Sequence, residues 1–284
     1  MSRIVYVNGD YLPEEEAKIS IFDRGFLMAD GVYEVTSVLD GKLIDFPGHM
    51  TRLHRSLSEL DMDPPVTDAE LETIHRELLA RNALAEGGIY LQVTRGAADR
   101  DFAFPENATP SLVLFTQAKS IADAPMARTG MKVISIPDIR WGRRDIKTVQ
   151  LLAPSLGKMM AKKAGADDAW MIEDGLITEG TSNNAYIVTK AGTIVTRDLS
   201  NAILHGITRA AVLAFAREAQ MKVEERAFTL DEAKDAAEAF ITSASTFVMP
   251  VVEIDGVQLG DGTPGPVAKR LREIYVTESL KRAS

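Results

Sequence analysis

Strands and helices do not alternate regularly along this chain, and this irregular order constrains the fold more than any other feature. Apolar residues alternate over 4–7, before the turn Asn8-Gly9-Asp10, and strands are predicted at 89–94 and 111–116. Two successive helices are predicted between the first of these strands and the second. A doubly wound parallel sheet needs a helix after nearly every strand, so the order excludes it. We predict an α+β fold, with helices segregated from largely antiparallel sheets.

The predicted helices rest on apolar spacing and on capping patterns. Leu53, Leu57 and Leu60 recur at helical spacing. A second helix begins at the capping box of Thr67 and Glu70, and the same pattern recurs at 229–232. The other predicted elements are strands at 131–136, 168–172, 184–188 and 240–242 and helices at 155–164, 207–219 and 266–280.

Residues 117–130 separate two regions of the chain. This stretch contains small residues and no apolar period, which is typical of a linker. With 284 residues, the chain is long enough for two domains. We predict a small N-terminal α+β domain over 1–118, an interdomain linker over 119–130 and a larger C-terminal domain over 131–284.

Composition excludes several classes of function. A hydrophobic content of 45% and a charged content of 26% are typical of a soluble globular protein. The net charge of −9 argues against a nucleic-acid groove, which needs clustered positive charge. The chain has no cysteine, which excludes disulfides and thiolate nucleophiles and fits a reducing compartment. Residues 1–10 have no apolar run of signal-peptide length, and no run approaches a membrane span. We expect a cytoplasmic protein without nucleic-acid or membrane partners.

Metal and nucleotide sites have no support in the sequence. His49 and His54 are five positions apart, on different faces of a helix, and His75 and His205 are isolated. Neither a phosphate-binding loop of the P-loop type nor a G-x-G-x-x-G pattern occurs.

Lys147 and Glu179 have the chemistry that pyridoxal phosphate requires at its two ends. A lysine amine forms a Schiff base with an aldehyde, and a buried carboxylate holds a ring nitrogen protonated. The cations Arg140, Arg143 and Arg144 precede Lys147 and would lower its basicity. Taken singly, lysine and glutamate are most often solvated surface residues, so the case depends on the surrounding motifs.

Several short motifs occur in one order along nearly the whole chain, and none is specific alone. Together they resemble the fold-type IV pyridoxal-phosphate enzymes, and within them the D-amino-acid aminotransferases. The segments that carry the resemblance are Asp23-Arg24-Gly25 with 30–35, which resembles the family's early strand motif; Gln92-Val93-Thr94-Arg95-Gly96 with Arg100-Asp101; Asp145-Ile146-Lys147; Thr178-Glu179-Gly180 with Ser182-Asn183; and Ile203-Leu204 with Gly206-Ile207-Thr208-Arg209.

The resemblance implies an α+β, two-domain fold whose larger domain binds pyridoxal 5'-phosphate. Lys147 would form the Schiff base, and Glu179 would contact the ring nitrogen with Ser182 near the ring. Backbone N–H groups at a helix start suit a phosphate, as does a loop of small residues. The implied phosphate-site residues are Leu204, Ile207, Thr208, Ser243, Ala244 and, as the cation, Arg52.

The substrate site departs from the family pattern at one position. The D-amino-acid enzymes bind the substrate carboxylate with a tyrosine near the N-terminus and with an arginine and a histidine two residues apart. Tyr33 and Arg100 match, but Phe102 stands at the histidine position. We expect Tyr90 to line the pocket as well. The resemblance also implies a homodimer, in which Arg100 reaches the neighbouring subunit's site.

These residues favour an aminotransferase that interconverts D-amino acids and 2-oxo acids. Lys147 would carry the proton between substrate Cα and cofactor C4′. Branched-chain L-aminotransferases, (R)-amine aminotransferases and aminodeoxychorismate lyases share the fold and stay open as alternatives. Arg100 with Tyr33 favours the D-amino-acid enzyme, and Phe102 keeps the (R)-amine alternative open. A non-catalytic protein that binds or stores the cofactor is a different class, and Arg100 argues against it.

Overall fold

The computed structural model describes residues 2–284, and the chain divides into two compact units. The first comprises Met1–Ser120, Ile146–Gln150 and Arg282–Ser284, and the second Ile121–Asp145 and Leu151–Lys281. Both units are assembled from separate stretches, whereas the domains predicted from the sequence are continuous. Lys147 belongs to the first unit and Glu179 to the second.

The first unit is built on a six-stranded antiparallel sheet. The order of its strands is β2-β1-β6-β5-β3-β4. At the hairpin between β1 and β2, Asn8 and Gly9 both have positive φ, as a tight two-residue turn requires, which confirms the predicted turn. The strands are β1 (Ile4–Val7), β2 (Asp10–Pro13), β3 (Gly31–Leu39), β4 (Lys42–Leu43), β5 (Gly87–Thr94) and β6 (Ser111–Ala118).

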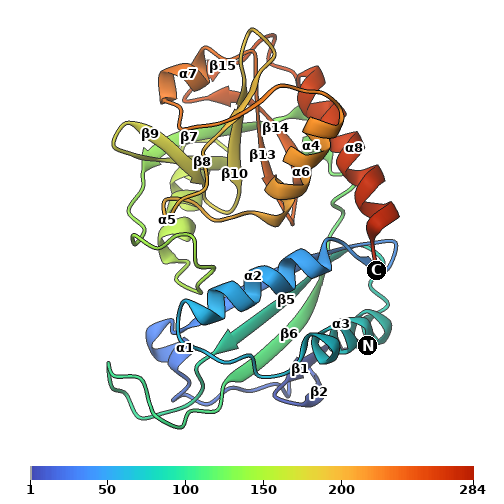
Figure 1. Ribbon diagram of the computed structural model, residues 1–284, viewed down its shortest axis with the longest axis vertical. Helices are drawn as coiled ribbons and strands as arrows, with labels where there is room; N and C mark the ends of the chain where they lie inside the picture. Colours follow the sequence, from blue (N-terminus) through green and yellow to red (C-terminus); the bar gives the residue numbers. More distant parts are fainter. Residues whose placement is uncertain (1) are drawn as a thin grey trace. The chain divides into compact units, whose positions relative to one another are not determined.

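Helices α2 (Phe46–Ser58) and α3 (Asp68–Asn82) pack across this sheet (Figure 1). The capping box of Thr67 and Glu70 is present at the start of α3, as predicted. Leu53 and Leu57 are buried in α2, but Leu60 lies beyond its end, so the predicted helix was too long. The motif at 23–25 is not strand: Arg24 begins the short helix α1 (Arg24–Met28), and the strand starts only at Gly31.

Side chains of β3 alternate between two faces of the sheet. Val32, Glu34 and Thr36 are fully buried, whereas Tyr33 and Val35 are half-buried on the opposite face. This alternation directs Glu34 towards α2 in the core, and it leaves Tyr33 on the more open face.

The second unit is built on a nine-stranded mixed sheet. Its main path is β12-β11-β10-β13-β14-β7-β8-β9, with β15 paired to β14. Three of its pairs are parallel, namely β11–β12, β14–β7 and β7–β8, and the others are antiparallel. The strands are β7 (Met131–Pro137), β8 (Asp168–Glu173), β9 (Leu176–Gly180), β10 (Asn184–Val188), β11 (Ile194–Thr196), β12 (Val223–Glu225), β13 (Glu238–Ser243), β14 (Phe247–Ile254) and β15 (Val257–Gln258).

The helices of the second unit are α4 (Pro125–Thr129), α5 (Leu152–Lys163), α6 (Ile207–Glu218), α7 (Leu230–Lys234) and α8 (Pro266–Arg282). Helix α4 lies within the stretch that the sequence indicated as a linker. The largely antiparallel sheets with segregated helices confirm the predicted α+β class.

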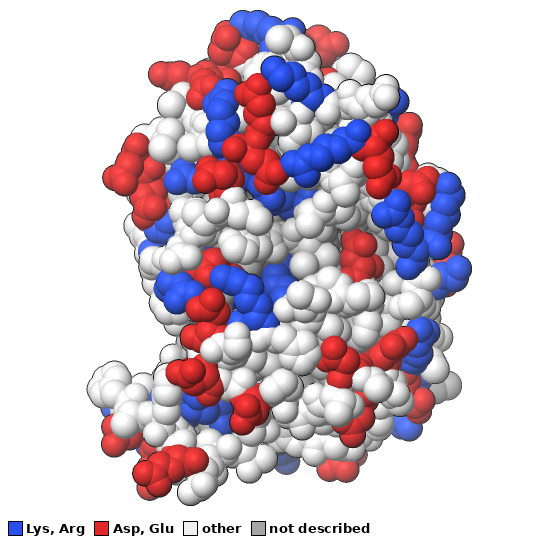
Figure 2. Space-filling model, viewed as in Figure 1, with Lys and Arg blue, Asp and Glu red and all other residues white. Residues whose placement is uncertain are grey.

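Charged side chains of both signs are interspersed over the face drawn in Figure 2. Elsewhere in the described chain, exposed ion pairs join residues such as Arg76 with Glu72 and Arg81 with Glu77 on α3. Within residues 2–284, no helix combines the length and the apolar character needed to cross a membrane.

Candidate active site

The backbone of Lys147 is fixed against the start of β3. Its carbonyl accepts a hydrogen bond of 2.9 Å from the Tyr33 N–H, and the Val149 N–H donates to the Gly31 carbonyl at 3.1 Å. The Lys147 N–H donates to Ser56 Oγ of α2 at 3.3 Å. The segment 146–150 thus lies antiparallel beside β3, which explains why it belongs to the first unit.

The amine of Lys147 lies over an aromatic ring. Its Nζ is 4.0 Å from the centroid of Tyr33, and the side chain is half-buried. Within the described part of the chain, no carboxylate pairs with this amine. A ring face stabilises an ammonium by only about 0.5–1 kcal/mol at exposed sites. The Tyr33 ring is therefore the group that this amine faces in the first unit.

Tyr33 is the first member of a row of stacked rings. Its ring centroid lies 5.5 Å from that of Tyr90, which lies 4.8 Å from that of Phe115. Burial raises the pKa of Tyr90 well above its usual value, and its hydroxyl donates to Gln92 Oε1 at 2.7 Å. Of the predicted substrate residues, Tyr33 and Tyr90 are thus brought together with Lys147.

Arg100 and Phe102 lie elsewhere, on the loop that joins β5 to β6 and projects from the sheet (Figure 1). Arg100 is exposed, and its guanidinium carbon is 5.4 Å from the ring centroid of Phe102. The Phe102 side chain is 79% exposed. In the part of the chain that is described, no contact joins Arg100 to Tyr33 or Lys147.

Arg52 is held by a buried carboxylate. Its Nε and Nη2 each donate to Glu34 at 2.7 Å, and His49 Nδ1 lies 2.7 Å from Glu34 Oε2. Burial alone would raise the pKa of Glu34, but Arg52 and His49 outweigh it and hold that pKa well below its usual value. Glu34 therefore fixes the orientation of the arginine that was predicted to bind phosphate.

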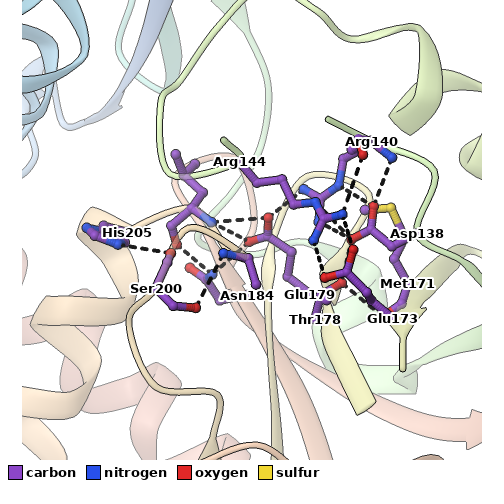
Figure 3. Close-up of polar contacts among 12 residues, drawn as sticks. Asp138, Arg140, Arg144, Met171, Glu173, Thr178, Glu179, Asn184, Ser200 and His205 are labelled. Atoms are coloured by element: carbon purple, nitrogen blue, oxygen red, sulfur yellow. Dashed lines mark hydrogen bonds and ion pairs between the residues drawn. The ribbon is translucent and has the colours of Figure 1, made fainter. Parts of the chain in front are cut away.

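Glu179 lies on β9, buried and surrounded by donors (Figure 3). Arg140 Nη1 donates to Oε1 at 2.5 Å, and the Leu204 N–H lies 3.2 and 3.1 Å from the two oxygens. Asn184 Nδ2 donates to Oε2 at 3.0 Å. Burial raises the pKa of Glu179, and Arg140 and the Leu204 amide oppose that rise. Desolvation and the fixed Arg140 cation thus shift the pKa of the Glu179 carboxyl in opposite directions.

Arg140 is itself fixed by Asp138. Nε donates to Oδ1 at 3.0 Å and Nη2 to Oδ2 at 2.7 Å, while Thr178 Oγ1 donates to the same Oδ2 at 2.7 Å. Desolvation would lower the pKa of Arg140, but Asp138 and Glu179 outweigh it, so the pKa is raised and the cation is permanent.

The other two arginines of this segment also have carboxylate partners. Arg144 donates to Glu173 at 2.7 and 2.6 Å, and Arg143 donates to Asp145 at 3.0 and 3.1 Å. The sequence suggested all three arginines as cations that lower the basicity of Lys147. In the structure, each is bound to an acid.

Gly206 and Asn184 connect Glu179 to the start of α6. Asn184 Nδ2 also donates to the Leu204 carbonyl at 3.0 Å, and a Cβ at Gly206 would lie 2.1 Å from Asn184 Oδ1. Only glycine therefore fits at this position. The first N–H groups of a helix have no intrahelical acceptor, so those of Ile207 and Thr208 can bind an anion.

Ser243 and Ala244 lie where β13 turns into β14. Ser243 Oγ is 2.7 Å from Thr246 Oγ1 and 3.3 Å from Ser245 Oγ, and Ser243 and Ala244 are half-buried. Ser182 is exposed in the turn between β9 and β10. Its neighbours Thr181 and Asn183 bind Asp168 at 2.5 and 2.6 Å.

Sequence reasoning missed Asn184 and the Asp138–Arg140 pair as site residues. Asn184 follows the recognised Ser182-Asn183 motif directly, so the motif could have been extended by one residue. Asp138 and Arg140 were visible only as charges before Lys147, because Glu179, the partner of Arg140, is distant in sequence.

Comparisons with known proteins show the family of this chain. A model of the family described as Amino-transferase class IV matches residues 31–254. The D-alanine aminotransferase of Staphylococcus haemolyticus is 41% identical over 273 residues, which cover 95% of each chain. That of Bacillus licheniformis is 40% identical over 268 residues, or 94% of each chain.

A solved structure is similar over nearly the whole length. It is a branched-chain amino acid aminotransferase from T.th., complexed with N-(5'-phosphopyridoxyl)-L-glutamate, and it has a TM-score of 0.89 and 28% sequence identity. The match covers 99% of this chain and 95% of that chain. The chain described here belongs to the class IV aminotransferase family.

Proposed function

We propose that this chain is a pyridoxal-phosphate-dependent aminotransferase that interconverts D-amino acids and 2-oxo acids. The observation that carries the proposal is the buried Glu179 carboxylate, held by Arg140, Asn184 and the Leu204 N–H. The matches to D-alanine aminotransferases over 95% of the chain support the choice of D-amino acids.

The residues present fit pyridoxal 5'-phosphate. Glu179 is a buried anion suited to a protonated ring nitrogen, and the N–H groups at the start of α6 suit a phosphate. Lys147 is an amine without a carboxylate partner among residues 2–284. When bound, the cofactor supplies an electron sink that stabilises negative charge on the substrate.

Each predicted residue has a role in this proposal. Lys147 binds the cofactor covalently and moves a proton between the substrate Cα and C4′. Glu179 holds the proton of the ring nitrogen, with Ser182 near the ring. The phosphate is bound by Arg52, Ile207, Thr208, Ser243 and Ala244. Leu204 belongs to the cofactor site through its N–H, which donates to Glu179.

The substrate carboxylate is bound by Arg100 with Tyr33, while Phe102 and Tyr90 add apolar surface. A guanidinium suits this task because it donates two parallel hydrogen bonds to a carboxylate. The exposure of Arg100 and Phe102 on a projecting loop supports delivery to a neighbouring subunit in a homodimer. The cytoplasmic location expected from the sequence remains a prediction.

A second candidate is an (R)-amine aminotransferase. Phe102 favours it, because an apolar ring stands where the D-amino-acid enzymes have a histidine that binds the carboxylate. A substrate without a carboxylate would lose nothing from that replacement.

A substrate panel tests the proposal. The purified protein, incubated with pyridoxal phosphate and 2-oxoglutarate, is given D-alanine, L-alanine or (R)-1-phenylethylamine, and product formation is followed. We expect turnover of D-alanine with little of L-alanine. Turnover of L-amino acids alone, or of the amine alone, would overturn it.

A further inference from the structure

Arg24 is a buried arginine to which the proposed reaction assigns no role. Its side chain is nearly inaccessible, and Nε donates to Asp30 Oδ2 at 2.7 Å. Nη1 donates to the Asp101 carbonyl at 2.7 Å and lies 3.4 Å from that of Ala103. These two carbonyls stand on either side of Phe102, and the first immediately follows Arg100.

Arg95, at the end of β5, contacts the same loop. It shares Asp30 with Arg24, at 2.9 Å, and its guanidinium carbon lies 3.6 Å from the ring centroid of Phe104. Its Nη2 donates to the Leu60 carbonyl at 2.7 Å. Asp30 therefore joins two guanidinium groups, and both contact the loop, one through its backbone and one through an aromatic ring.

The base of the loop is anchored separately. The Ala98 N–H donates to the Phe22 carbonyl at 3.1 Å, and Asp23 forms a β-bridge with Ala97. Asp23 Oδ2 accepts from Thr94 at 2.8 Å and from Ser111 at 2.7 Å. These contacts hold the two ends of the loop without the Arg24 guanidinium. The guanidinium instead binds residues 101–103, which we call the tip of the loop.

The hydrogen bonds of the Arg24 guanidinium and the conformation of the tip depend on each other. A buried guanidinium is unfavourable unless acceptors surround it. Arg24 has one carboxylate, and its other acceptors are the backbone carbonyls of the tip. If the tip moved away, those donors would lose their partners, so the cation opposes the movement.

We propose that Arg24 is a positioning residue for substrate recognition: it holds the tip of the β5–β6 loop in the conformation that presents Arg100 and Phe102. The inference rests on the proposed function, because it assumes that Arg100 binds the substrate carboxylate. Arg24 would thus affect the binding of substrates that carry a carboxylate without touching the substrate itself.

Steady-state kinetics of Arg24→Met on two substrates test the inference. We expect the KM for D-alanine to rise by about tenfold, since a charged hydrogen bond is loosened, while kcat for D-alanine and both constants for (R)-1-phenylethylamine change little. Arg81→Met is the matched control, because Arg81 also pairs with an acid and lies 4.4 Å from a ring, that of Tyr11, outside the loop. It should change neither substrate's KM.

Combining Arg24→Met with Arg100→Ala shows whether the first acts through the second. The double variant should have the same KM for D-alanine as Arg100→Ala alone, because the effects of substitutions at coupled residues are not additive. Additive losses would overturn the inference. An Arg24→Met variant that affects both substrates equally, while Arg100→Ala remains selective for D-alanine, would also overturn it and leave the proposed function intact.

Limited trypsin digestion gives a readout that needs no activity. We expect cleavage after Arg100 to be faster in Arg24→Met than in wild type or Arg81→Met. Equal cleavage rates would contradict the bracing role. If Arg24→Met does not fold, Arg24→Lys keeps the charge beside Asp30 but lacks the planar fork, and should show the same two effects. If Arg100→Ala is unselective, the proposed carboxylate role fails, and the digestion alone decides whether Arg24 braces the loop.

Discussion

Arg140 donates a 2.5 Å hydrogen bond to Glu179, and the same arginine is bound on its other side by Asp138. The carboxyl that we assign to the ring nitrogen thus has a fixed cation beside it. Burial favours the neutral carboxylic acid, which could not hold a pyridinium by charge, and Arg140 favours the carboxylate.

Arg140→Gln should move the acid limb of kcat/KM to higher pH. The pKa of Glu179 is already raised by burial, and loss of the cation raises it further, so the carboxylate is lost at a higher pH as the solution is acidified. Arg143→Gln is the control, since Arg143 comes from the same segment and pairs with Asp145. The measurement is a pH profile of kcat/KM for both variants and the wild type. An unchanged acid limb in Arg140→Gln would contradict the role of Arg140 in keeping Glu179 ionised.

Glu179→Gln should keep the cofactor but slow turnover by at least about a hundredfold, the scale of losing one preorganised charge interaction. The amide cannot hold the ring proton by charge. Cofactor content is measured by absorbance and kcat with D-alanine at saturating cofactor. Near-normal kcat would show that Glu179 has no role in the chemistry.

The local elements were predictable because their determinants are local. The capping box of Thr67 and Glu70 and the turn at Asn8-Gly9 involve residues at most three positions apart, and both occur as predicted. Strand β14 was missed: Pro250 interrupts its apolar run, yet it pairs opposite Phe240 in the sheet. A proline usually argues against a central strand.

The motifs predicted candidate residues but not their contacts. Motif order indicated Lys147, Tyr33 and Glu179 as candidates, whereas the pairing of Glu34 with Arg52 and of Arg140 with Glu179 depends on the fold. No local pattern indicated that residues 146–150 would lie beside β3, because that placement is set by hydrogen bonds to Gly31 and Tyr33.

Glu34→Gln should destabilise the protein in a pH-dependent way. Breaking a buried ion pair costs about 3–5 kcal/mol at neutral pH. Since the folded pKa of Glu34 is depressed, its contribution is present above the ordinary glutamate pKa of about 4.3 and is lost as pH falls towards the lower folded value. The difference between variant and wild type should therefore shrink in acid.

Urea unfolding at neutral and acid pH measures that difference. Glu72→Gln serves as the control, because Glu72 forms an exposed ion pair with Arg76, and such pairs contribute about 0–1 kcal/mol. A free-energy difference for Glu34→Gln as small as that of the control would show that the buried pair does not stabilise the fold.

Mixed dimers test whether Arg100 acts on the neighbouring subunit. Subunits with Lys147→Ala and subunits with Arg100→Ala should each have little activity with D-alanine alone. Mixing and reassociating them should restore one intact site per heterodimer, hence a recovery of activity measured against each parent. Failure to recover, with heterodimers shown by mass spectrometry, would place the arginine in the site of its own subunit.

The most direct measurement is borohydride trapping of the cofactor followed by peptide mapping. With enzyme and pyridoxal phosphate alone, we expect the reduced phosphopyridoxyl group on Lys147. Preincubation with D-alanine, without a 2-oxo acid, should abolish that label because the substrate displaces the lysine, and L-alanine should leave it in place. A label on Lys158, Lys162 or Lys163, or equal loss with both enantiomers, would contradict the account.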